Sequence, residues 1–254
     1  REVLPDPKFG SQDVSKFIRA FAGDHKYIVD YLVEEVLATQ PEPIRRFLLQ
    51  TAILDRLNGS LCDALTGQEQ GGARLEALQR GNYFVVPLDD KRNWYRYHPL
   101  FADVLRLHLM AEQPDEVSDL HRRASAWHEH HGSAPDAIRH ALAASDFERA
   151  ADLIELAAPA IRKSRQESAA TVLGWLKALP DEMVRLRPVL CVDYAFALFG
   201  VGEIDDVEAR LREAERWLDT TADMRERPDA PPAGGMVVVN KEGFRHLPGM
   251  IALI

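Results

Sequence analysis

The sequence is poor in the features that define several large classes of protein. Only two of its 254 residues are cysteines, and Cys62 and Cys191 stand far apart, which argues against a disulfide framework or a cysteine-based zinc site. The longest apolar run, VLCVDYAFALFGVG, is interrupted by Asp193 and is too short to span a bilayer. No secretory signal peptide is visible. We therefore expect a protein of the reducing cytoplasm that does not contact a membrane.

Positive charge is also scarce. The chain has 31 lysines and arginines against 40 aspartates and glutamates, a formal net charge of −9. Such a chain has no general attraction for nucleic acid, and no long basic run offers a local one. The sequence also lacks a G-x-x-x-x-G-K-[ST] stretch, so we do not expect this chain alone to hydrolyse ATP. Because it begins at Arg1 and ends on the uncapped apolar stretch LPGMIALI, we expect it to be a piece of a longer protein.

What is present is mainly helical patterning. Apolar residues at helical spacing predict two helices, over 11–23 and 25–40, before Pro41. A different unit follows, with three helical segments and then two β-rich runs on either side of the turn DDKRN. Three helices and a β-hairpin are typical of a winged-helix domain, which we place at 41–112. Its last helix begins with Pro99, a position where proline is tolerated.

From residue 113 onward the sequence predicts pairs of helices. Two junctions, HALAASDFERAADLI and AFALFGVGEIDDVEARL, both join a small-residue helix to an acidic helix start through a short polar turn. Small residues let neighbouring helices approach closely, as in tetratricopeptide-like hairpins. The fold class is therefore mainly α, with an irregular TPR-like α-solenoid over 113–254. The stretch 221–235 is rich in proline and glycine and reads as a loop.

The sequences of several long motifs resemble those of one family. These motifs are FIRAFAGDHKYIVDYLVEEVLATQPEPIRRFLLQTAILDRL, LEALQRGNYFVVPLDDKRNWYRYHPLFADVLRLHL, LHRRASAWHEHHG and AIRHALAASDFERAADLIE. In this order they are similar to the large ATP-dependent LuxR-family transcription activators related to MalT, which are signal-transduction ATPases with numerous domains (STAND). The resemblance covers nearly the whole chain.

The resemblance implies a domain order and a function. Members of the family carry a P-loop nucleotide-binding domain, a winged helix, a helical sensor and a C-terminal LuxR-type DNA-binding domain. On this basis residues 1–40 are the helical end of the ATPase module, and the chain is a non-catalytic regulatory fragment. The parent would bind ATP or ADP with Mg²⁺, hydrolyse ATP slowly, contact DNA only through its missing C-terminal domain, and self-associate. An unknown inducer or protein would bind the helical region.

The resemblance also implies a role for one histidine. In relatives of this architecture, the histidine at the start of the helix after the winged hairpin contacts the phosphates of bound ADP and holds the resting state. His98 in YHPLFADVL matches that position, and Pro99 follows it where many distant relatives have an acidic residue. The alternative from the sequence alone is that His98 hydrogen-bonds the local backbone at the start of the helix.

Other patterns favour ordinary structural roles. In WHEHHG, the spacing of His128, His130 and His131 fits a solvated helix end better than a metal site. Trp127, Trp175 and Trp217 each lie on an apolar stripe and are expected in the core, although one of them at the border of an inducer pocket is an alternative. Acidic runs such as EIDDVEARLREAE have no catalytic partner and fit solvated helix faces.

Two other functions stay open at this level. The first is a protein–protein interaction module, in which the α-solenoid docks a partner without any role for nucleotide. The second is a winged-helix DNA-binding protein, for which 73–82 would be the recognition helix. Acidic residues nearly balance the basic ones over 41–98, which weighs against the second alternative. The exposed set of the recognition helix would be Arg74, Glu76, Gln79, Arg80 and Asn82.

Overall fold

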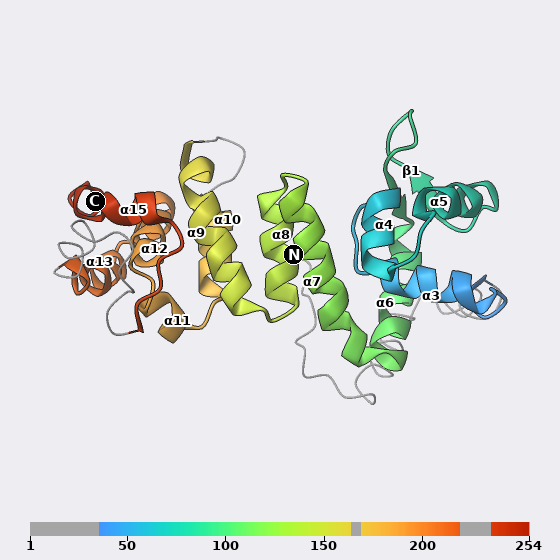
Figure 1. Ribbon diagram of the computed structural model, residues 1–254, viewed down its shortest axis with the longest axis horizontal. Helices are drawn as coiled ribbons and strands as arrows, with labels where there is room; N and C mark the ends of the chain where they lie inside the picture. The colour runs from blue at the N-terminus through green and yellow to red at the C-terminus, as the bar shows by residue number, and fades with distance from the viewer. Residues whose placement is uncertain (1–35, 164–168, 219–234, 254) are drawn as a thin grey trace. The chain divides into compact units, whose positions relative to one another are not determined.

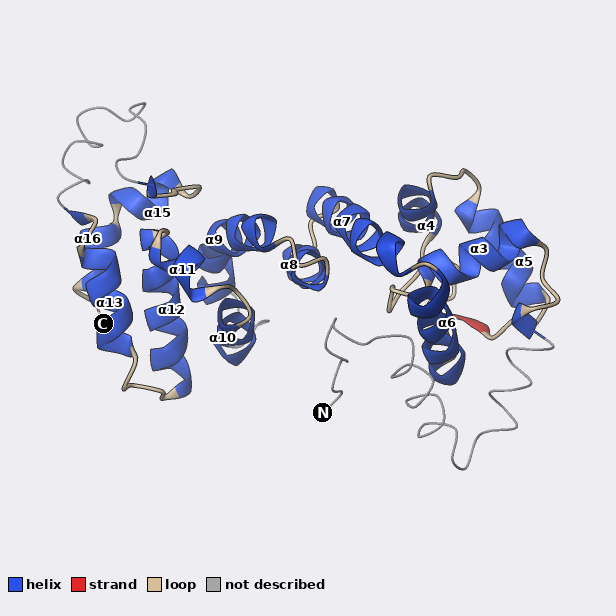
Figure 2. Ribbon diagram, turned by 90° about the horizontal axis from the view of Figure 1, so that it is seen from below, coloured by secondary structure: helices blue, strands red, loops and turns tan. Residues whose placement is uncertain are grey.

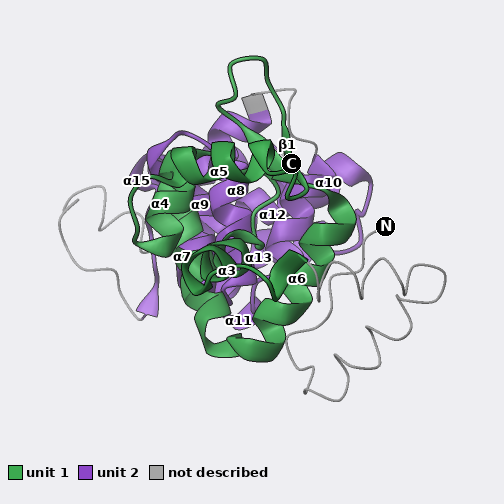
Figure 3. Ribbon diagram, turned by 90° about the vertical axis from the view of Figure 1, so that its right-hand side faces the viewer, with its two compact units in different colours: residues 1–127 green, residues 128–254 purple. Residues whose placement is uncertain are grey.

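A computed structural model of the chain describes residues 36–163, 169–218 and 235–253. The predicted helix at 11–23, most of the one at 25–40, and the predicted loop apart from Gly235 lie outside these residues. The chain divides into two compact units, residues 1–127 and 128–254, which Figure 3 distinguishes by colour. Each unit is described by itself below. The predicted domain boundaries, at 40/41 and 112/113, stay a prediction.

The first unit contains the three helices and the hairpin that the sequence predicts for a winged-helix domain (Figure 1). A fourth helix follows the hairpin directly. The elements are α3 (Glu42–Thr51), α4 (Gly59–Thr66), α5 (Gly71–Arg80), β1 (Val85–Pro87), β2 (Tyr95–Tyr97) and α6 (Pro99–Glu112). The fold class of this part is therefore confirmed.

The first of these helices is shorter than its sequence pattern suggests. The apolar pattern continues to Leu57, but α3 ends at Thr51. Leu57 instead pairs with Tyr95, and the two residues exchange backbone hydrogen bonds of 2.8 Å each. Asn58 then caps α4 by accepting a hydrogen bond from the backbone N–H of Leu61 at 2.8 Å. The segment between α3 and α4 thus pairs with strand β2 of the hairpin through one residue, Leu57.

The hairpin is antiparallel, with Val86 opposite Arg96. Successive side chains of a strand point to opposite faces. Accordingly Tyr95 and Tyr97 are buried and Arg96 between them is exposed. The hydroxyl groups of Tyr97 and Thr51 are 2.7 Å apart in the core, which joins β2 to the end of α3.

The turn of the hairpin is organised by one carboxylate. Asp89 accepts hydrogen bonds from the backbone N–H groups of Asn93, at 3.1 Å, and Trp94, at 2.8 Å. These bonds, the one from Asn93 most of all, hold the pKa of Asp89 below its usual value. The aspartates of DDKRN were predicted to suit a tight turn, and Asp89 has that role.

A long helix, α7 (Pro114–His130), carries the chain into the second unit. Figure 2, coloured by secondary structure, shows the helical character of both units. The second unit contains only helices among its described residues. They are α8 (Ala134–Ala143), α9 (Phe147–Lys163), α10 (Ala169–Lys177), α11 (Asp181–Arg185), α12 (Pro188–Val201), α13 (Val207–Glu215), α15 (Lys241–Arg245) and α16 (Leu247–Ile251).

The helices of this unit contact their neighbours in succession: α9 packs against α8 and α10, and α12 packs against α10 and α13. The apolar pattern of EMVRLRPVLCVDYAFALFGVGE, residues 182–203, is continuous and predicts one helix, but α11 and α12 divide this segment. Pro188 has no backbone N–H to donate and therefore begins a new helix. Alanines at the α8–α9 contact are fully buried, as the small-residue pattern predicts: Ala137, Ala141, Ala150 and Ala151. The assignment to a TPR-like α-solenoid stays a prediction.

None of the helices in the described part of the chain combines the length and the apolar character that crossing a bilayer requires.

A buried carboxylate fastens the segment before α15 to the helical unit. Glu155 on α9 has a fully buried side chain, and its Oε1 accepts hydrogen bonds of 2.9 Å from the backbone N–H groups of both Val239 and Asn240. Its Oε2 lies 3.5 Å from Nη1 of Arg187, which also contacts Asp152 at 2.6 Å. Burial raises the pKa of Glu155, and the two backbone donors and Arg187 oppose that rise.

We predict that Glu155→Ala lowers the free energy of unfolding by about 2–4 kcal/mol, because it leaves two backbone donors without their buried acceptor and removes one of the two carboxylates beside Arg187. Urea denaturation followed by circular dichroism measures the change. Glu148→Ala is the matched control, since Glu148 lies exposed near the start of the same helix. A loss for Glu155→Ala no larger than that of the control would contradict this role.

Candidate functional site

His98 lies between strand β2 and helix α6, and its side chain is exposed. Its backbone is used on both sides: the N–H donates to the carbonyl of Phe84 at 2.7 Å, and the carbonyl accepts from Ala102 at 3.0 Å. The imidazole forms no capping hydrogen bond with the helix. It lies edge-on to the Phe84 ring, with 6.4 Å between centroids. The alternative in which the His98 side chain serves as a local helix cap is therefore wrong.

The residues on either side hold this backbone in place. Tyr97 is buried and hydrogen-bonded to Thr51, and Phe101 in the first turn of α6 is fully buried. The Phe101 ring packs 5.8 Å from Tyr97 and 5.5 Å from Phe84, between ring centroids. The imidazole is thus presented to solvent from a fixed support. Such preorganisation lowers the entropy cost of binding a ligand.

Arg96 is a second exposed group of the same strand. It lies two residues before His98, and the buried Tyr97 separates them. Residues two apart on an extended strand share a face, so the guanidinium and the imidazole project from the same side of β2. Both groups donate hydrogen bonds to phosphate or carboxylate oxygens. Arg96 was not predicted as a site residue, although the alternation of side chains in YRYH is a signal that could have identified it.

We predict that His98→Ala leaves the thermal stability of the chain within about 0.5 kcal/mol of the wild type, because an exposed side chain without a capping bond contributes little to folding. Differential scanning calorimetry tests this expectation. Tyr97→Phe is the informative comparison: it removes the buried hydroxyl partner of Thr51, and we expect it to cost about 1–2 kcal/mol. A larger loss for His98→Ala than for Tyr97→Phe would restore a structural role for the histidine.

The helix that would contact DNA in the DNA-binding alternative offers little free positive charge. On α5, Arg80 forms an ion pair with Glu76 at 3.0 Å. Arg74 is partly buried, donates a hydrogen bond to Gln68, and lies 5.6 Å above the Phe47 ring. Both arginines are thus engaged within the domain. This arrangement weighs against duplex binding by α5, which needs cations that face the phosphates.

The histidines near the end of α7 pack against the next helix. The rings of His128 and His140 are stacked, with centroids 5.4 Å apart and an interplanar angle of 11°. His128 also lies 3.8 Å from the carboxylate of Asp136. Among the described residues, no group of three or more His, Cys, Asp or Glu side chains is arranged to hold a metal ion. Here His128 has a packing role that the solvated-helix interpretation did not predict.

We predict that His128 makes the chain less stable as the pH falls through the range below about 6.5, its ordinary pKa. Burial lowers the pKa of His128 in the folded state, so the unfolded chain binds more protons there. The unfolding free energy of wild type should therefore drop more steeply on acidification than that of His128→Gln. Urea midpoints at several pH values compare the two proteins. Equal slopes would show that His128 does not titrate with folding.

The tryptophans and cysteines behave as structural residues. Trp127, Trp175 and Trp217 are partly buried and pack against the hydrophobic clusters, which agrees with the core interpretation. Both cysteines are buried and free. Burial raises the pKa of Cys62 and raises that of Cys191 to about 12, so neither thiol is a nucleophile near neutral pH.

Comparison with known families identifies a match for the winged-helix part of the chain. Residues 33–117 match the MalT winged helix domain. The match therefore contains α3 to α6, the hairpin and His98, and it extends beyond the predicted boundaries of 41 and 112.

Comparison with characterised proteins finds relatives of two kinds. The serine/threonine-protein kinase PknK of Mycobacterium tuberculosis is 35% identical over 227 residues, 87% of this chain and 20% of PknK. PknK of Mycobacterium bovis gives the same values. The HTH-type transcriptional regulator MalT of Cronobacter sakazakii is 35% identical over 207 residues, 81% of this chain and 23% of MalT. The chain thus corresponds to about a fifth of the length of each relative.

Proposed function

From the match of residues 33–117 to the MalT winged helix domain, we propose that the chain is a MalT-like regulatory region of a larger nucleotide-controlled protein. In this proposal it transmits the state of a bound nucleotide to a helical region that senses a signal. The observation that carries the proposal is the position of His98, exposed on a fixed support at the start of α6.

The names of the relatives support a regulatory role for the shared region. One relative is a protein kinase and the other is a transcriptional regulator, yet both match most of this chain at 35% identity. Two such proteins deliver different outputs. A region they have in common is therefore better suited to controlling an output than to producing it. We propose accordingly that the chain itself is not an enzyme, and that catalysis or DNA binding belongs to other parts of the parent.

The proposed mechanism uses Arg96 and His98, the two exposed hydrogen-bond donors at the end of β2. In the resting state, His98 and Arg96 donate hydrogen bonds to the phosphates of ADP held by the nucleotide-binding domain of the parent. Charge-assisted hydrogen bonds of this kind are among the stronger polar contacts in proteins. Exchange of ADP for ATP with Mg²⁺ removes the contact and shifts the parent toward an open, self-associating form. A ligand that binds the helical region favours the same form.

Several features of the proposal concern the parent rather than this chain. ATP, ADP and Mg²⁺ would be bound mainly by the nucleotide-binding domain. DNA would be contacted only by a LuxR-type domain, where the parent is a transcription factor of the cytoplasm. The relatives are four to five times longer than the region they share with this chain, which is consistent with additional domains.

We predict that His98→Ala in the full-length parent weakens ADP binding about tenfold, which corresponds to roughly 1.4 kcal/mol, and leaves ATP binding nearly unchanged. Isothermal titration calorimetry at fixed Mg²⁺ and ionic strength measures both affinities. Arg96→Ala should weaken ADP binding in the same direction. Lys91→Ala, an exposed cation in the turn of the same hairpin, is the matched control and should change neither affinity.

Two results would contradict the proposal. If His98→Ala and Lys91→Ala bind ADP equally well, the histidine is not a phosphate contact. If instead the chain binds duplex DNA with a steep dependence on salt, and mutation of the α5 arginines removes that binding, the winged helix is a DNA-binding domain. If His98→Ala does not weaken ADP binding and the chain does not bind duplex DNA either, a protein–protein interaction module is the better description.

A further inference from the structure

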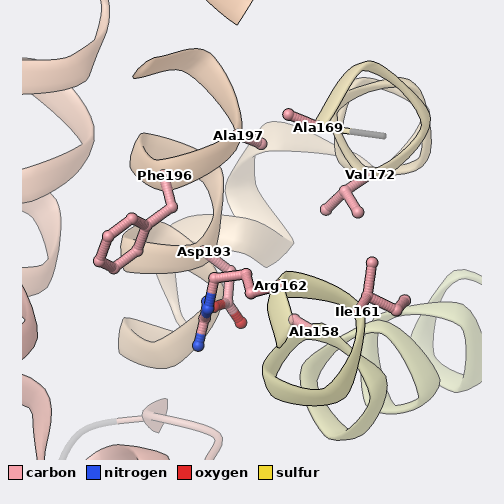
Figure 4. Close-up of a pocket in the computed structure, with 8 residues that line it drawn as sticks. All are labelled: Ala158, Ile161, Arg162, Ala169, Val172, Asp193, Phe196 and Ala197. Carbon is pink, nitrogen blue, oxygen red and sulfur yellow. The ribbon is translucent and has the colours of Figure 1, made fainter. Parts of the chain in front are cut away.

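The second unit contains a pocket that the proposed nucleotide contact does not use. It has a volume of about 280 Å³ and lies between α9, α10 and α12 (Figure 4). Its wall is mostly apolar, with Ile161, Val172, Phe196 and three alanines. Two charged residues interrupt this wall, Arg162 from α9 and Asp193 from α12.

Asp193 is the unusual member of this wall. Its side chain is fully buried, although it sits in the most apolar of the described helices. One carboxylate oxygen, Oδ1, accepts a hydrogen bond from Nη1 of Arg162. The other, Oδ2, is buried and has no hydrogen-bond partner among the described residues. A buried acceptor without a partner costs free energy, so an unsatisfied oxygen in a pocket wall points to a missing donor.

Arg162 provides the complementary group. Its guanidinium lies 5.0 Å above the Phe196 ring, and 32% of its side chain is exposed. A guanidinium has five N–H donors, and the contact with Asp193 occupies only part of this capacity. The pair therefore places a buried, unsatisfied acceptor, Oδ2, in the wall of the pocket beside the partly exposed guanidinium of Arg162.

Small residues provide the space itself. Ala158, Ala169 and Ala197 each end at Cβ in the lining, and so leave room between the three helices. The helices α10 and α12 approach closely near the pocket, since a Cβ atom added at Gly200 would lie 2.8 Å from the Cβ of Ala169. The pocket is at the small end of the range for ligand sites, which suits a compact molecule of roughly ten non-hydrogen atoms.

We propose that this pocket binds a small uncharged amide, with its N–H donating to Oδ2 of Asp193, its carbonyl accepting from Arg162, and its apolar body against Val172 and Ile161. The charges of the pair argue for an uncharged ligand. A carboxylate would lie beside Asp193, and an ammonium group would lie beside Arg162. A primary amide, in contrast, presents a donor and an acceptor in one plane and matches both groups together.

The inference deepens the sensing role of the helical region and rests on that proposed function for its biological meaning. Binding to the pocket is nevertheless measured on this chain without nucleotide or DNA. It can therefore fail while the role of His98 stands, and it can succeed when His98 proves not to contact ADP.

The test is a titration of the 254-residue chain with benzamide, followed through the methyl NMR signals of Ile161 and Val172. We expect saturable shifts of both signals with benzamide. We expect at least fivefold weaker binding of benzoate, benzylamine and N,N-dimethylbenzamide, which keeps the carbonyl but has no N–H to donate. Asp193→Asn should weaken benzamide binding at least fivefold. Asp205→Asn, at an exposed position before α13, is the matched control and should bind as the wild type does.

A second variant keeps the test decisive if Asp193→Asn does not fold. Val172→Phe fills the pocket without changing the charged pair, and it should abolish binding while circular dichroism shows an intact helical fold. The proposal is overturned if benzamide does not saturate the signals, or if all four compounds bind alike. It is also overturned if a folded Val172→Phe variant binds benzamide with wild-type affinity.

Discussion

The two-residue alternation of strand β2 is the constraint on which the first unit depends. Tyr95 and Tyr97 enter the core, and the buried hydroxyl contact between Tyr97 and Thr51 ties the strand to helix α3. Because those two side chains are fixed in the core, the alternation of the strand directs the side chains of Arg96 and His98 outward. Arg96 and His98 are exposed for this reason. A shift of register by one residue would bury Arg96 and His98 and expose the tyrosines, so the packing of the core keeps both side chains at the surface.

Much of this arrangement follows from sequence patterns. The helices, the hairpin and its aspartate turn were predicted because apolar spacing, caps and turn residues are local signals. The early end of α3 was not predicted, since the pairing of Leu57 with Tyr95 joins residues 38 positions apart that no local pattern connects. The break at Pro188 was missed for a different reason. The apolar run continues across it, and the missing N–H of one proline outweighed the periodicity.

The functional residues divide in a similar way into those that the sequence predicts and those that only the packing of the helices reveals. His98 was identified through family resemblance, and the structure adds that its imidazole forms no capping hydrogen bond. Arg96 could have been identified from alternation alone. The partners of Glu155, in contrast, lie 84 and 85 residues away, and the buried position of Asp193 within an apolar helix gives no hint that its Oδ2 lacks a partner. Long-range polar contacts of this kind depend on helix packing, which one sequence does not reveal.

The contact between α9 and α12 illustrates how such polar pairs set a geometry. Glu155 on α9 faces Arg187, the residue immediately before α12, and Arg162 on α9 faces Asp193 within α12. The two pairs are oppositely oriented: α9 supplies the acid in one and the base in the other. Seven residues separate the α9 partners and six separate the α12 partners, so both pairs lie about two turns apart along their helices.

Sliding α9 by two turns would bring Glu155 toward Asp193, or Arg162 toward Arg187. Like charges meeting in a buried contact are strongly unfavourable, so the pairs select one register. A ligand that satisfies Oδ2 of Asp193 would strengthen one of the two contacts that fix this register, and so would favour the packed arrangement of α9 against α12.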